Sequence, residues 1–179
     1  MKAVVALALL VVLQVSVTDA SSSYALTIGT NRPFYLVGET MNVYGQLSYN
    51  GWPIQSQLIA VQIQNPWAET IFLCTITTDS EGRYSVSFKL PPEAQVGTYT
   101  ALANHNAVAN RTVFNVVEFL GDVNADGVVD LKDVFAVAKA YNSYPGHPSW
   151  NPLCDLNFDG KVDLKDYFTT IENYGKGTR

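Results

Sequence analysis

From residue 24 to residue 118 the chain alternates apolar and polar positions with a period of two. Residues 61–64 read Val-Gln-Ile-Gln, and residues 84–89 read Tyr-Ser-Val-Ser-Phe-Lys. This alternation is typical of strands that bury one face, and turn-forming pairs such as Asn50-Gly51 fall between the runs. We therefore predict seven strands, over residues 24–28, 41–49, 58–64, 70–78, 83–90, 98–104 and 109–118. Seven short strands at this spacing predict an all-β, Ig-like antiparallel sandwich.

After residue 121 the apolar spacing changes to that of helices. Two apolar stripes at helical spacing predict two short helices, one through Val134, Val137, Ala138 and Tyr141, the other through Tyr167, Phe168, Ile171 and Tyr174. The sequence therefore predicts a second, small helical module, and a module of about 55 residues rarely holds a sufficient core without an added staple. Residues 118–121 contain no Pro-rich or Gly/Ser-rich linker, so we expect the two modules to lie close together.

The helical module contains a duplicated twelve-residue segment. Residues 122–133, DVNADGVVDLKD, recur 33 positions later as residues 155–166, DLNFDGKVDLKD. Both copies place Asp, Asn, Asp, Asp and Asp at positions 1, 3, 5, 9 and 12 and Gly at position 6, and they hold eight of the chain's 16 acidic residues. A hard cation that binds six to eight oxygens needs this arrangement, so the repeat predicts two calcium loops. Solvated acidic turns are the alternative, which the identical register of the two copies disfavours.

We expect each loop to hold one Ca²⁺ ion with six residues. The expected ligands are side-chain oxygens at positions 1, 3 and 5, the backbone carbonyl at position 7 and the carboxylate at position 12. Position 9 is expected to reach the ion through a water molecule. Without an ion the carboxylates repel one another, so we expect calcium binding and folding to be linked. The predicted ligands are Asp122, Asn124, Asp126, Val128, Asp130 and Asp133 in the first loop, and Asp155, Asn157, Asp159, Lys161, Asp163 and Asp166 in the second.

These loops differ from those of the common EF-hand, which has Glu at position 12 and a helix before the loop. Here position 12 is Asp, and we predict no helix before either loop. Duplicated loop–helix units with Asp at position 12 resemble the type I dockerin domain, over residues 121–175. The resemblance implies a cohesin-type protein module as the partner, contacted through loop positions 10 and 11. Those positions are Leu131, Lys132, Leu164 and Lys165.

Because the same Leu-Lys pair occurs in both repeats, the resemblance implies two docking orientations related by a rotation of about 180°. Leu-Lys departs from the Ser/Thr-rich pairs of many cellulosomal dockerins, which leaves the identity of the partner open. Core packing of the two leucines and a solvated helix face for the two lysines are the alternatives.

The sandwich has a resemblance of its own. Residues 34–40, Gly45, residues 78–84, Leu90-Pro91 and residues 97–99 resemble the macroglobulin-type β-sandwich domains, the second of them (MG2) in particular. Similar modules serve as spacers in surface proteins, and no thioester-bearing segment is present to imply protease trapping. We therefore divide the chain into residues 1–20, the sandwich at 21–118 and the calcium module at 119–179.

Residues 1–20 have the features of a secretory signal peptide. Lys2 precedes an uncharged apolar run over residues 3–17, and residues 18–20 place small side chains at the −3 and −1 positions of a cleavage site. We expect a secreted or cell-surface protein with no membrane span after removal of the signal; retention as an uncleaved anchor is the alternative. Cys74 and Cys154 fall in different modules, and export permits a disulfide between them without requiring one.

The remaining composition narrows the function. A net charge of −5 with only 15% charged residues excludes a nucleic-acid binder, and two Ca²⁺ ions would leave about −1. The two histidines, His105 and His147, have no catalytic or metal-ligand spacing, so we predict no enzyme. We predict instead an exported calcium-binding adaptor in an extracellular or surface assembly, with a link to polysaccharide degradation as one setting. The alternatives are a carbohydrate-binding accessory module that uses Tyr49, Trp52 and Trp67, and a surface spacer with structural calcium.

Overall fold

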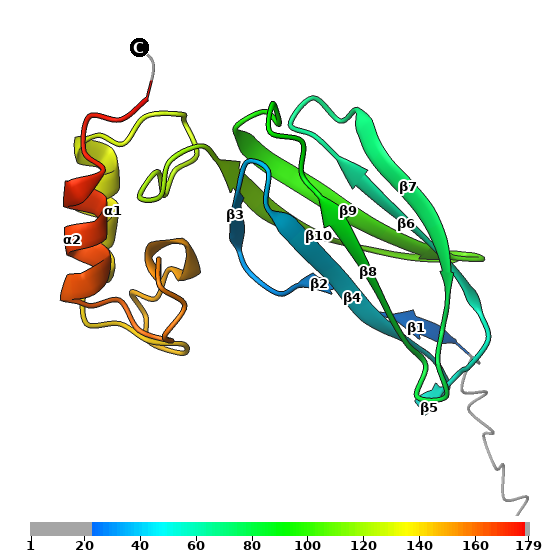
Figure 1. Cartoon of the computed structure of the whole chain (residues 1–179). Helices are drawn as coiled ribbons and strands as arrows, with labels where there is room; N and C mark the ends of the chain where they lie inside the picture. The colour runs from blue at the N-terminus through cyan, green and yellow to red at the C-terminus, as the bar shows by residue number, and fades with distance from the viewer. Residues whose placement is uncertain (1–22, 178–179) are drawn as a thin grey trace, which may run out of the picture.

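The computed structural model describes residues 23–177, and the predicted signal peptide, residues 1–20, lies outside them. Figure 1 shows a β-sandwich joined to a small module that carries two helices. The strands are β1 (Tyr24–Leu26), β2 (Gly29–Thr30), β3 (Phe34–Leu36), β4 (Thr40–Tyr49), β5 (Trp52–Pro53), β6 (Leu58–Gln64), β7 (Thr70–Thr77), β8 (Arg83–Lys89), β9 (Gly97–His105) and β10 (Val108–Val117). The helices are α1 (Leu131–Ala140), the 3₁₀ turn η1 (Pro152–Cys154) and α2 (Leu164–Glu172).

Two sheets form the sandwich, as the alternation predicts. In the first sheet β4 pairs with β1, β2, β5 and β8, all antiparallel; the second has the order β3-β10-β9-β6-β7. All seven predicted strands are present. The sequence does not predict β2, β3 and β5, because strands of two or three residues are too short to show a period. One pairing departs from the antiparallel pattern: β3 runs parallel to β10, with Phe34 opposite Asn115.

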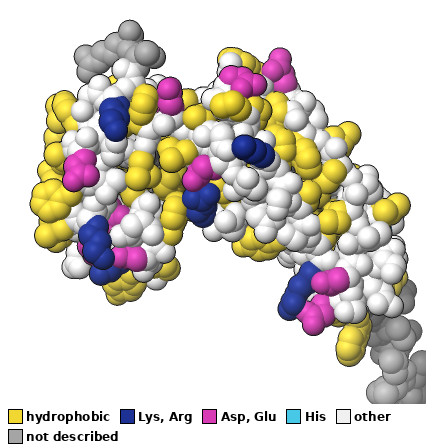
Figure 2. Space-filling model, in the orientation of Figure 1, with side chains coloured by type: hydrophobic (Ala, Val, Ile, Leu, Met, Phe, Trp, Pro, Cys, Tyr) yellow, Lys and Arg dark blue, Asp and Glu magenta, His cyan; other side chains and the backbone are white. Residues whose placement is uncertain are grey.

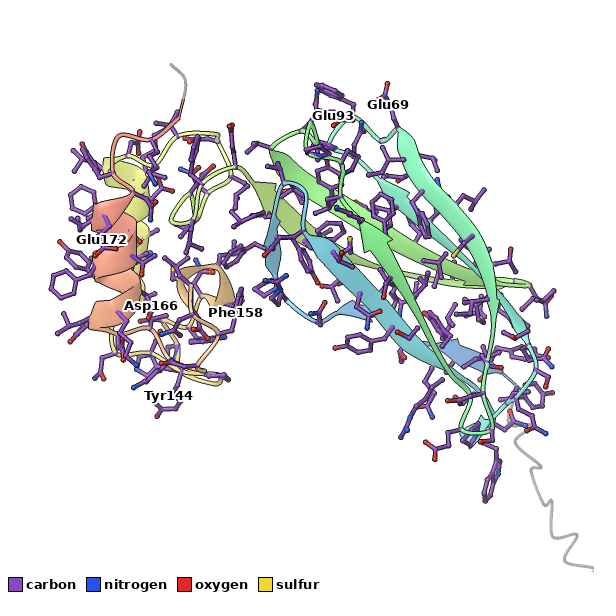
Figure 3. The ribbon with its side chains drawn as sticks, in the orientation of Figure 1. Glu69, Glu93, Tyr144, Phe158, Asp166 and Glu172 are labelled. Atoms are coloured by element: carbon purple, nitrogen blue, oxygen red, sulfur yellow. The ribbon has the colours of Figure 1, made fainter. Side chains whose placement is uncertain are left out.

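Alternate residues of the strands fill one apolar core between the sheets. Figure 3 shows the inward-pointing side chains between the two layers. The ring of Phe114 lies at the centre, with its centroid 5.6 Å from that of Tyr35 and 5.5 Å from that of Tyr99. Aromatic pairs at such distances add about 0.5–1.5 kcal/mol beyond the apolar area that they bury. Fully buried aliphatic residues surround them, among them Met41, Val43, Leu47, Ile59, Val61 and Ile63.

Gly45 has a steric role in this core. The Tyr84 hydroxyl donates a hydrogen bond to the Thr27 carbonyl at 2.5 Å, and it crosses β4 directly beside Gly45. A Cβ atom at residue 45 would lie 2.0 Å from the Thr27 carbonyl oxygen and 2.4 Å from the Tyr84 hydroxyl. No side chain fits at those distances, so Gly45 permits this link between β8 and Thr27, the residue after β1.

A second apolar cluster joins the sandwich to the C-terminal module. Phe34 and Val117 of the sandwich pack with buried residues from the two acidic loops, from η1 and from α1, and the cluster includes Val123, Val137, Cys154, Leu156 and Val162. At its edge the ring of Phe158 lies 5.1 Å from that of Phe34. The Arg32 guanidinium lies 5.4 Å from the Phe158 ring, and Figure 3 shows Phe158 on the side of its module that faces the sandwich. The two modules therefore pack directly, as the missing linker predicts.

Both predicted helices are present, as α1 and α2. Most of the apolar residues on their two stripes do not face the core: Val137 is buried, but Ala138, Tyr141, Phe168, Ile171 and Tyr174 are exposed. The buried face of α1 instead carries Asp133, Val137 and Ala140, and that of α2 carries Asp166 and Thr170. These residues lie three or four positions apart, and the aspartate that reaches back to the loop sets the rotation of each helix.

The two cysteines are free thiols. Cys74 lies on β7, while Cys154 is buried in the cluster between the modules. Burial raises the pKa of the Cys154 thiol to about 12, so this cysteine serves as a small apolar core residue. None of the helices within residues 23–177 has the length and hydropathy needed to cross a bilayer.

Candidate metal centre

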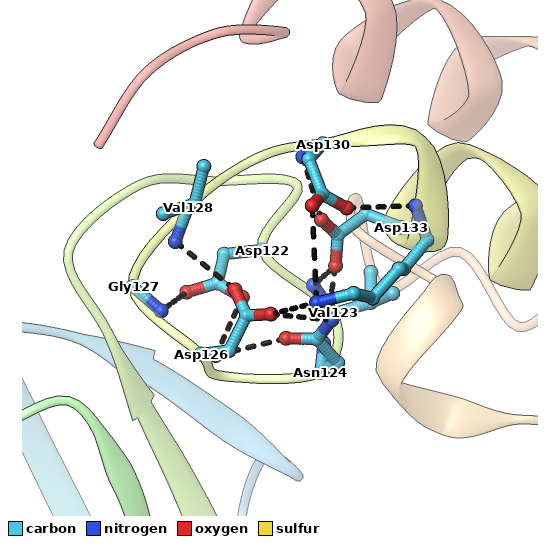
Figure 4. A network of polar contacts seen from close by, with 9 residues as sticks. Asp122, Val123, Asn124, Asp126, Gly127, Val128, Asp130 and Asp133 are labelled. Atoms are coloured by element: carbon cyan, nitrogen blue, oxygen red, sulfur yellow. Dashed lines mark hydrogen bonds and ion pairs between the residues drawn. The ribbon is translucent and has the colours of Figure 1, made fainter. Parts of the chain in front are cut away.

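The first loop closes on its own aspartates. The two carboxylate oxygens of Asp122 accept hydrogen bonds from the amides of Asp126 at 3.1 Å and Gly127 at 2.9 Å (Figure 4). The side-chain oxygen of Asn124 accepts from the Asp126 amide at 2.8 Å. Ala125 and Gly127 have φ of 55° and 87°, in the left-handed region, and these two residues turn the backbone around the carboxylates.

Asp133 ties the two ends of this loop together. One of its oxygens accepts from the amides of Val123 at 3.0 Å and Asn124 at 3.3 Å, and the other accepts from the Asp130 amide at 2.8 Å. Asp130 in turn caps α1, since its carboxylate accepts from the Lys132 amide at 2.7 Å. The pair forms a capping box, with Asp133 fully buried at 0% exposure. A carboxylate at position 12 therefore belongs to the fold of the loop as well as to the expected ligand set.

The second loop repeats this framework position by position. The Gly160 amide donates to Asp155 at 3.0 Å, and the Asp159 amide donates to Asn157 at 2.9 Å. Asp166 accepts from the amides of Leu156 and Asp163, each at 2.8 Å. Phe158 and Gly160 have φ of 59° and 85°, matching positions 4 and 6 of the first loop. The duplicated sequence therefore folds into duplicated geometry.

The loops are held by the segments that follow the helices. Val129, at position 8 of the first loop, exchanges backbone hydrogen bonds of 2.9 Å with Gly175 and Lys176, which follow α2. Val162, at position 8 of the second, donates to the Ser143 carbonyl at 2.9 Å, and Ser143 follows α1. Each loop is thus pinned by the chain that leaves the other helix. The sequence does not predict these backbone hydrogen bonds. It also does not predict η1, the turn before Asp155, in which the Asn151 side chain accepts from the Leu153 amide at 3.1 Å.

The electrostatics of the loops favour a cation. Burial raises the pKa of Asp122 to about 6, with further contributions from the charges of Asp133 and Asp126. Burial also raises the pKa of Asp133 and of Asp155. These shifts mean that the negative form is costly without a nearby positive charge, and a divalent ion removes that cost.

The donor types also fit calcium, because carboxylate, amide and carbonyl oxygens are the ligands that it prefers. Within residues 23–177 no three Asp, Glu, His or Cys side chains converge as a formed metal cage. The carboxylates accept hydrogen bonds from the amides of their own loop instead. The structure thus places the predicted side chains in two loops of the same shape, while their carboxylates bond to backbone amides and do not converge on one point.

Lysines neutralise the outer carboxylates. The Lys132 ammonium lies 2.9 Å from Asp126, and this pairing holds the pKa of the Asp126 carboxyl below its usual range. The corresponding Lys165 lies 3.6 Å from Asp159. These pairs are on the surface, where such ion pairs contribute little to stability.

The predicted docking residues occupy the first turn of each helix and are exposed. Leu131 and Leu164 have 58% and 53% of their surface accessible, which contradicts the alternative that they pack in the core. Phe135 and Phe168, one turn further along each helix, are also exposed, at 70% and 56%, and neither is among the predicted docking residues. Their shared spacing of 33 is the signal that could have identified them. Figure 1 shows both helices on the side of the module away from the sandwich, and Figure 2 shows apolar side chains along that edge.

The three aromatic residues considered for sugar binding do not form one platform. Tyr49 and Trp52 are paired across β4 and β5, and the Tyr49 ring lies 4.9 Å from that of Tyr24. Trp67 lies in the turn between β6 and β7. Figure 3 places Glu69 of that turn at the opposite end of the sandwich from β5.

Comparisons with known proteins identify the domain family of each module. The model of the MG2 domain family matches residues 25–116. The chain belongs to the MG2 domain family. The model of the dockerin type I domain matches residues 120–173, directly after the MG2 domain. Both resemblances drawn from the sequence, and their order, are confirmed. Calcium binding and protein interaction are the properties expected of a dockerin type I domain, and neither domain is a catalytic module.

Solved structures agree with the MG2 assignment at the level of fold. Escherichia coli alpha-2-macroglobulin activated by porcine elastase superposes with a TM-score of 0.51 at 22% identity, covering 55% of this chain and 9% of that one. Trypsin-activated alpha-2-macroglobulin from Escherichia coli gives 0.51 at 22%, covering 56% and 7%. The chain therefore spans less than a tenth of either macroglobulin. None of the curated proteins matches the chain.

Proposed function

We propose that this protein is an exported, non-catalytic adaptor that attaches through its dockerin domain to a cohesin-type module in an extracellular or cell-surface assembly. The MG2 domain acts as a rigid spacer in this proposal. The observation that carries it is the repetition of one loop with the same main hydrogen bonds, each copy leading into a helix that starts with an exposed Leu-Lys pair. A module built as two equivalent halves suits a binding role better than a purely structural one.

In this proposal two Ca²⁺ ions complete the dockerin domain. Each ion supplies positive charge to a loop whose buried carboxylates disfavour their negative form. The chain's own amides already orient the carboxylates of positions 1 and 12, so little side-chain ordering remains when the ion binds. The residues proposed to hold the ions are Asp122, Asn124, Asp126, Val128, Asp130 and Asp133, and Asp155, Asn157, Asp159, Lys161, Asp163 and Asp166.

The partner is proposed to contact the start of either helix. Leu131 with Lys132 on α1, and Leu164 with Lys165 on α2, are exposed at equivalent positions. The sandwich packs against the loop side of the module, through Phe34 and Phe158, and leaves the helix side open. Either helix can therefore face the partner, and a variant that disables the surface of one helix can still bind through the other.

A capture experiment tests the proposal. The full chain is immobilised and exposed to the host's surface fraction in calcium and in EDTA, and the retained proteins are identified. We expect a cohesin-type protein retained in calcium alone. Leu131→Asp with Leu164→Asp should abolish retention while calorimetry still shows calcium uptake, and either change alone should have little effect. Leu73→Asp, on the exposed face of β7, is the matched control. Retention by the double variant would overturn the proposed surface.

A carbohydrate-binding role is the second candidate, favoured by one observation. Trp52 is 77% exposed on β5, opposite Tyr49 of β4, whose ring lies 4.9 Å from that of Tyr24. Exposed indole rings stack on sugar rings, so a glycan array that retains the chain and loses it on Trp52→Ala would favour this role. If the chain takes up calcium but retains no protein in the capture experiment and binds no sugar on the glycan array, the result would favour a surface spacer with structural calcium.

A further inference from the structure

Strand β7 forms one edge of the second sheet, and its outer side is unpaired. Among the described residues it pairs with β6 alone. Thr78, just after β7, exchanges backbone hydrogen bonds of 2.9 and 2.8 Å with the segment before β6. Backbone groups alternate in direction along an antiparallel strand, so Leu73, Thr75 and Thr77 turn their N–H and C=O groups away from β6. Within residues 23–177 no strand meets this row of donors and acceptors.

The edge also lacks the features that keep exposed strands from pairing. Proteins blunt such edges with charged side chains, prolines, bulges or short strands. The eight residues of β7 include no charge and no proline, and its register shift lies at its first residues, opposite Ile63 and Gln64. Leu73, in the middle of the strand, is 67% exposed. A long, regular and uncharged edge is a template for a further strand.

The apolar core is incompletely covered on this side of the sandwich. The inward-facing residues of β6 are fully buried. Their partners across the ladder on β7, namely Phe72, Cys74 and Ile76, are only partly buried. Phe88 of β8, at the neighbouring edge of the first sheet, is also partly buried, and its ring lies 4.7 Å from that of Phe72. A strand added beside β7 would cover these side chains.

The sequence of β7 is suited to pairing with itself. In a two-fold symmetric antiparallel pair, residues opposite each other point to the same face of the joined sheet. Inward-facing residues must therefore meet inward-facing residues. A register centred on Cys74 satisfies this condition, since it places Phe72 opposite Ile76 of the second copy and Leu73 opposite Thr75. Such aromatic and β-branched pairs stabilise sheets, and no like charges meet because β7 has none.

We propose that two copies of this chain associate through antiparallel pairing of β7 with β7, in the register centred on Cys74. The two five-stranded sheets then form one continuous sheet with a β3 strand at each end. The interface is small, with eight residues a side against about 20–30 in a standard interface, so we expect a weak dimer. The pairing does not depend on the proposed function.

The dimer would present two dockerin domains far apart. The dockerin domain packs against Phe34 of β3, at the end of the sheet opposite β7 (Figure 1). Nine strand spacings of about 4.8 Å separate the two β3 strands, which places them about 43 Å apart. This consequence rests on the proposed function, because two docking domains on one rigid sheet would allow bivalent attachment.

Sedimentation equilibrium of the full chain, expressed with its export signal, tests the association. We expect the mass in calcium to rise toward twice that of the monomer between about 1 and about 300 μM, the range for an interface this small. Thr75→Pro removes an outward-facing donor and Leu73→Lys places two like charges beside the axis, so each should weaken the dimer at least about tenfold. Val113→Lys, on the exposed face of β10, is the matched control and should leave the dimer unchanged.

Oxidation tests the register. Cys74 would face Cys74 of the second copy at a non-hydrogen-bonded position, where Cα atoms lie about 4.5 Å apart, within the range of disulfides. Copper(II) phenanthroline accepts two electrons while the two thiols release two protons and form one S–S bond. We expect a disulfide-linked dimer from the wild type and none from Cys74→Ser, since Cys154 is buried. Leu73→Cys in the Cys74→Ser background should cross-link at least about tenfold more slowly, because residue 73 faces residue 75.

Folding and recognition are separated by the two edge variants. Leu73 is exposed, so Leu73→Lys should keep the circular dichroism and the calcium uptake of the wild type even if Thr75→Pro does not. A wild type that stays monomeric at every concentration, or a dimer that Leu73→Lys leaves unchanged, would overturn the pairing. A dimer weakened by Leu73→Lys but not cross-linked through Cys74 would overturn the register.

The capture experiment distinguishes this inference from the proposed function. The dockerin domain does not use β7, so Leu73→Lys should retain the same cohesin-type protein as the wild type. Failure of the dimer would leave the adaptor role standing, and failure of the capture would leave the dimer standing. A different protein that binds the monomer and is lost on Leu73→Lys would show that β7 pairs with a strand of another chain, which would overturn the assignment to a second copy.

Discussion

The two modules of this protein bury different chemistry. The MG2 sandwich fills its interior with aromatic and aliphatic side chains from both sheets. The dockerin domain buries a carboxylate, Asp133 or Asp166, on the inner face of each helix and satisfies it with backbone amides. Burial of apolar area is the main source of stability in the first arrangement, whereas the second also has to balance buried negative charge.

The modules also differ in how self-sufficient they are. The apolar cluster of the dockerin domain includes Phe34 and Val117 from the sandwich, while the sandwich core takes no residue from the dockerin domain. Small modules rarely supply enough core of their own. From this comparison we expect the dockerin domain to rely on two external supports, bound calcium and the neighbouring sandwich.

Removal of calcium is the largest test of this contrast. We expect EDTA to lower the unfolding free energy of the dockerin domain by about 5 kcal/mol relative to calcium at 100 times Kd, since each of two sites then contributes about 2.7 kcal/mol. Scanning calorimetry with and without EDTA should show one transition move and the other stay within a few degrees. A single transition that ignores the chelator would break the comparison.

The converse test removes core from the sandwich. Leu47 is fully buried on β4, so Leu47→Ala should lower the unfolding free energy of the sandwich by about 2–5 kcal/mol. Urea unfolding followed by tryptophan fluorescence measures this loss, because two of the three tryptophans, Trp52 and Trp67, lie in the sandwich. Leu58→Ala, at an exposed position of β6, is the control and should cost under about 0.5 kcal/mol. Calcium stoichiometry should be unchanged in both; a loss would show that the modules share one core.

A smaller effect is expected at the contact between the modules. Phe158→Ala removes the ring that touches Phe34 and Arg32, and we expect a loss of about 1–2 kcal/mol from the dockerin domain. The equivalent residue of the first loop, Ala125, has the same left-handed φ, so the backbone tolerates alanine there. Small-angle scattering and residual dipolar couplings should detect looser coupling between the modules. Unchanged residual dipolar couplings would show that the buried residues of the cluster, and not Phe158, fix the orientation of the two modules.

The smallest effect concerns the lysine beside the first loop. Lys132 pairs with Asp126, a proposed calcium ligand, so we expect Lys132→Gln to raise calcium affinity by at most about fivefold at low salt, with the gain shrinking as salt increases. Calorimetric titration at two ionic strengths measures it. Lys139→Gln is the control, since no ion pair of Lys139 is found among the described residues. Equal gains from both changes would point to net charge instead of a direct contact.

The sequence by itself determined the features that are written locally. The period of two in β4, β6 and β8 predicts those strands, because residues two apart share a sheet face wherever the strand is placed. The sequence also predicts the two loops, because their hydrogen bonds join residues of the same twelve-residue segment. Asp122, Asn124 and Gly127 of the first loop, and their counterparts in the second, bond within their own loop.

Tertiary structure decided what depends on distant partners. Nothing local marks β3 as the parallel neighbour of β10, or Phe158 as the residue that meets Phe34. The sequence leaves the rotation of the helices open for the same reason: Tyr141 and Phe168 have the hydrophobicity of core residues, yet they are exposed while Asp133 and Asp166 are buried. Hydrophobic spacing reports that a helix has an apolar side, and only packing against the loops fixes which side faces in.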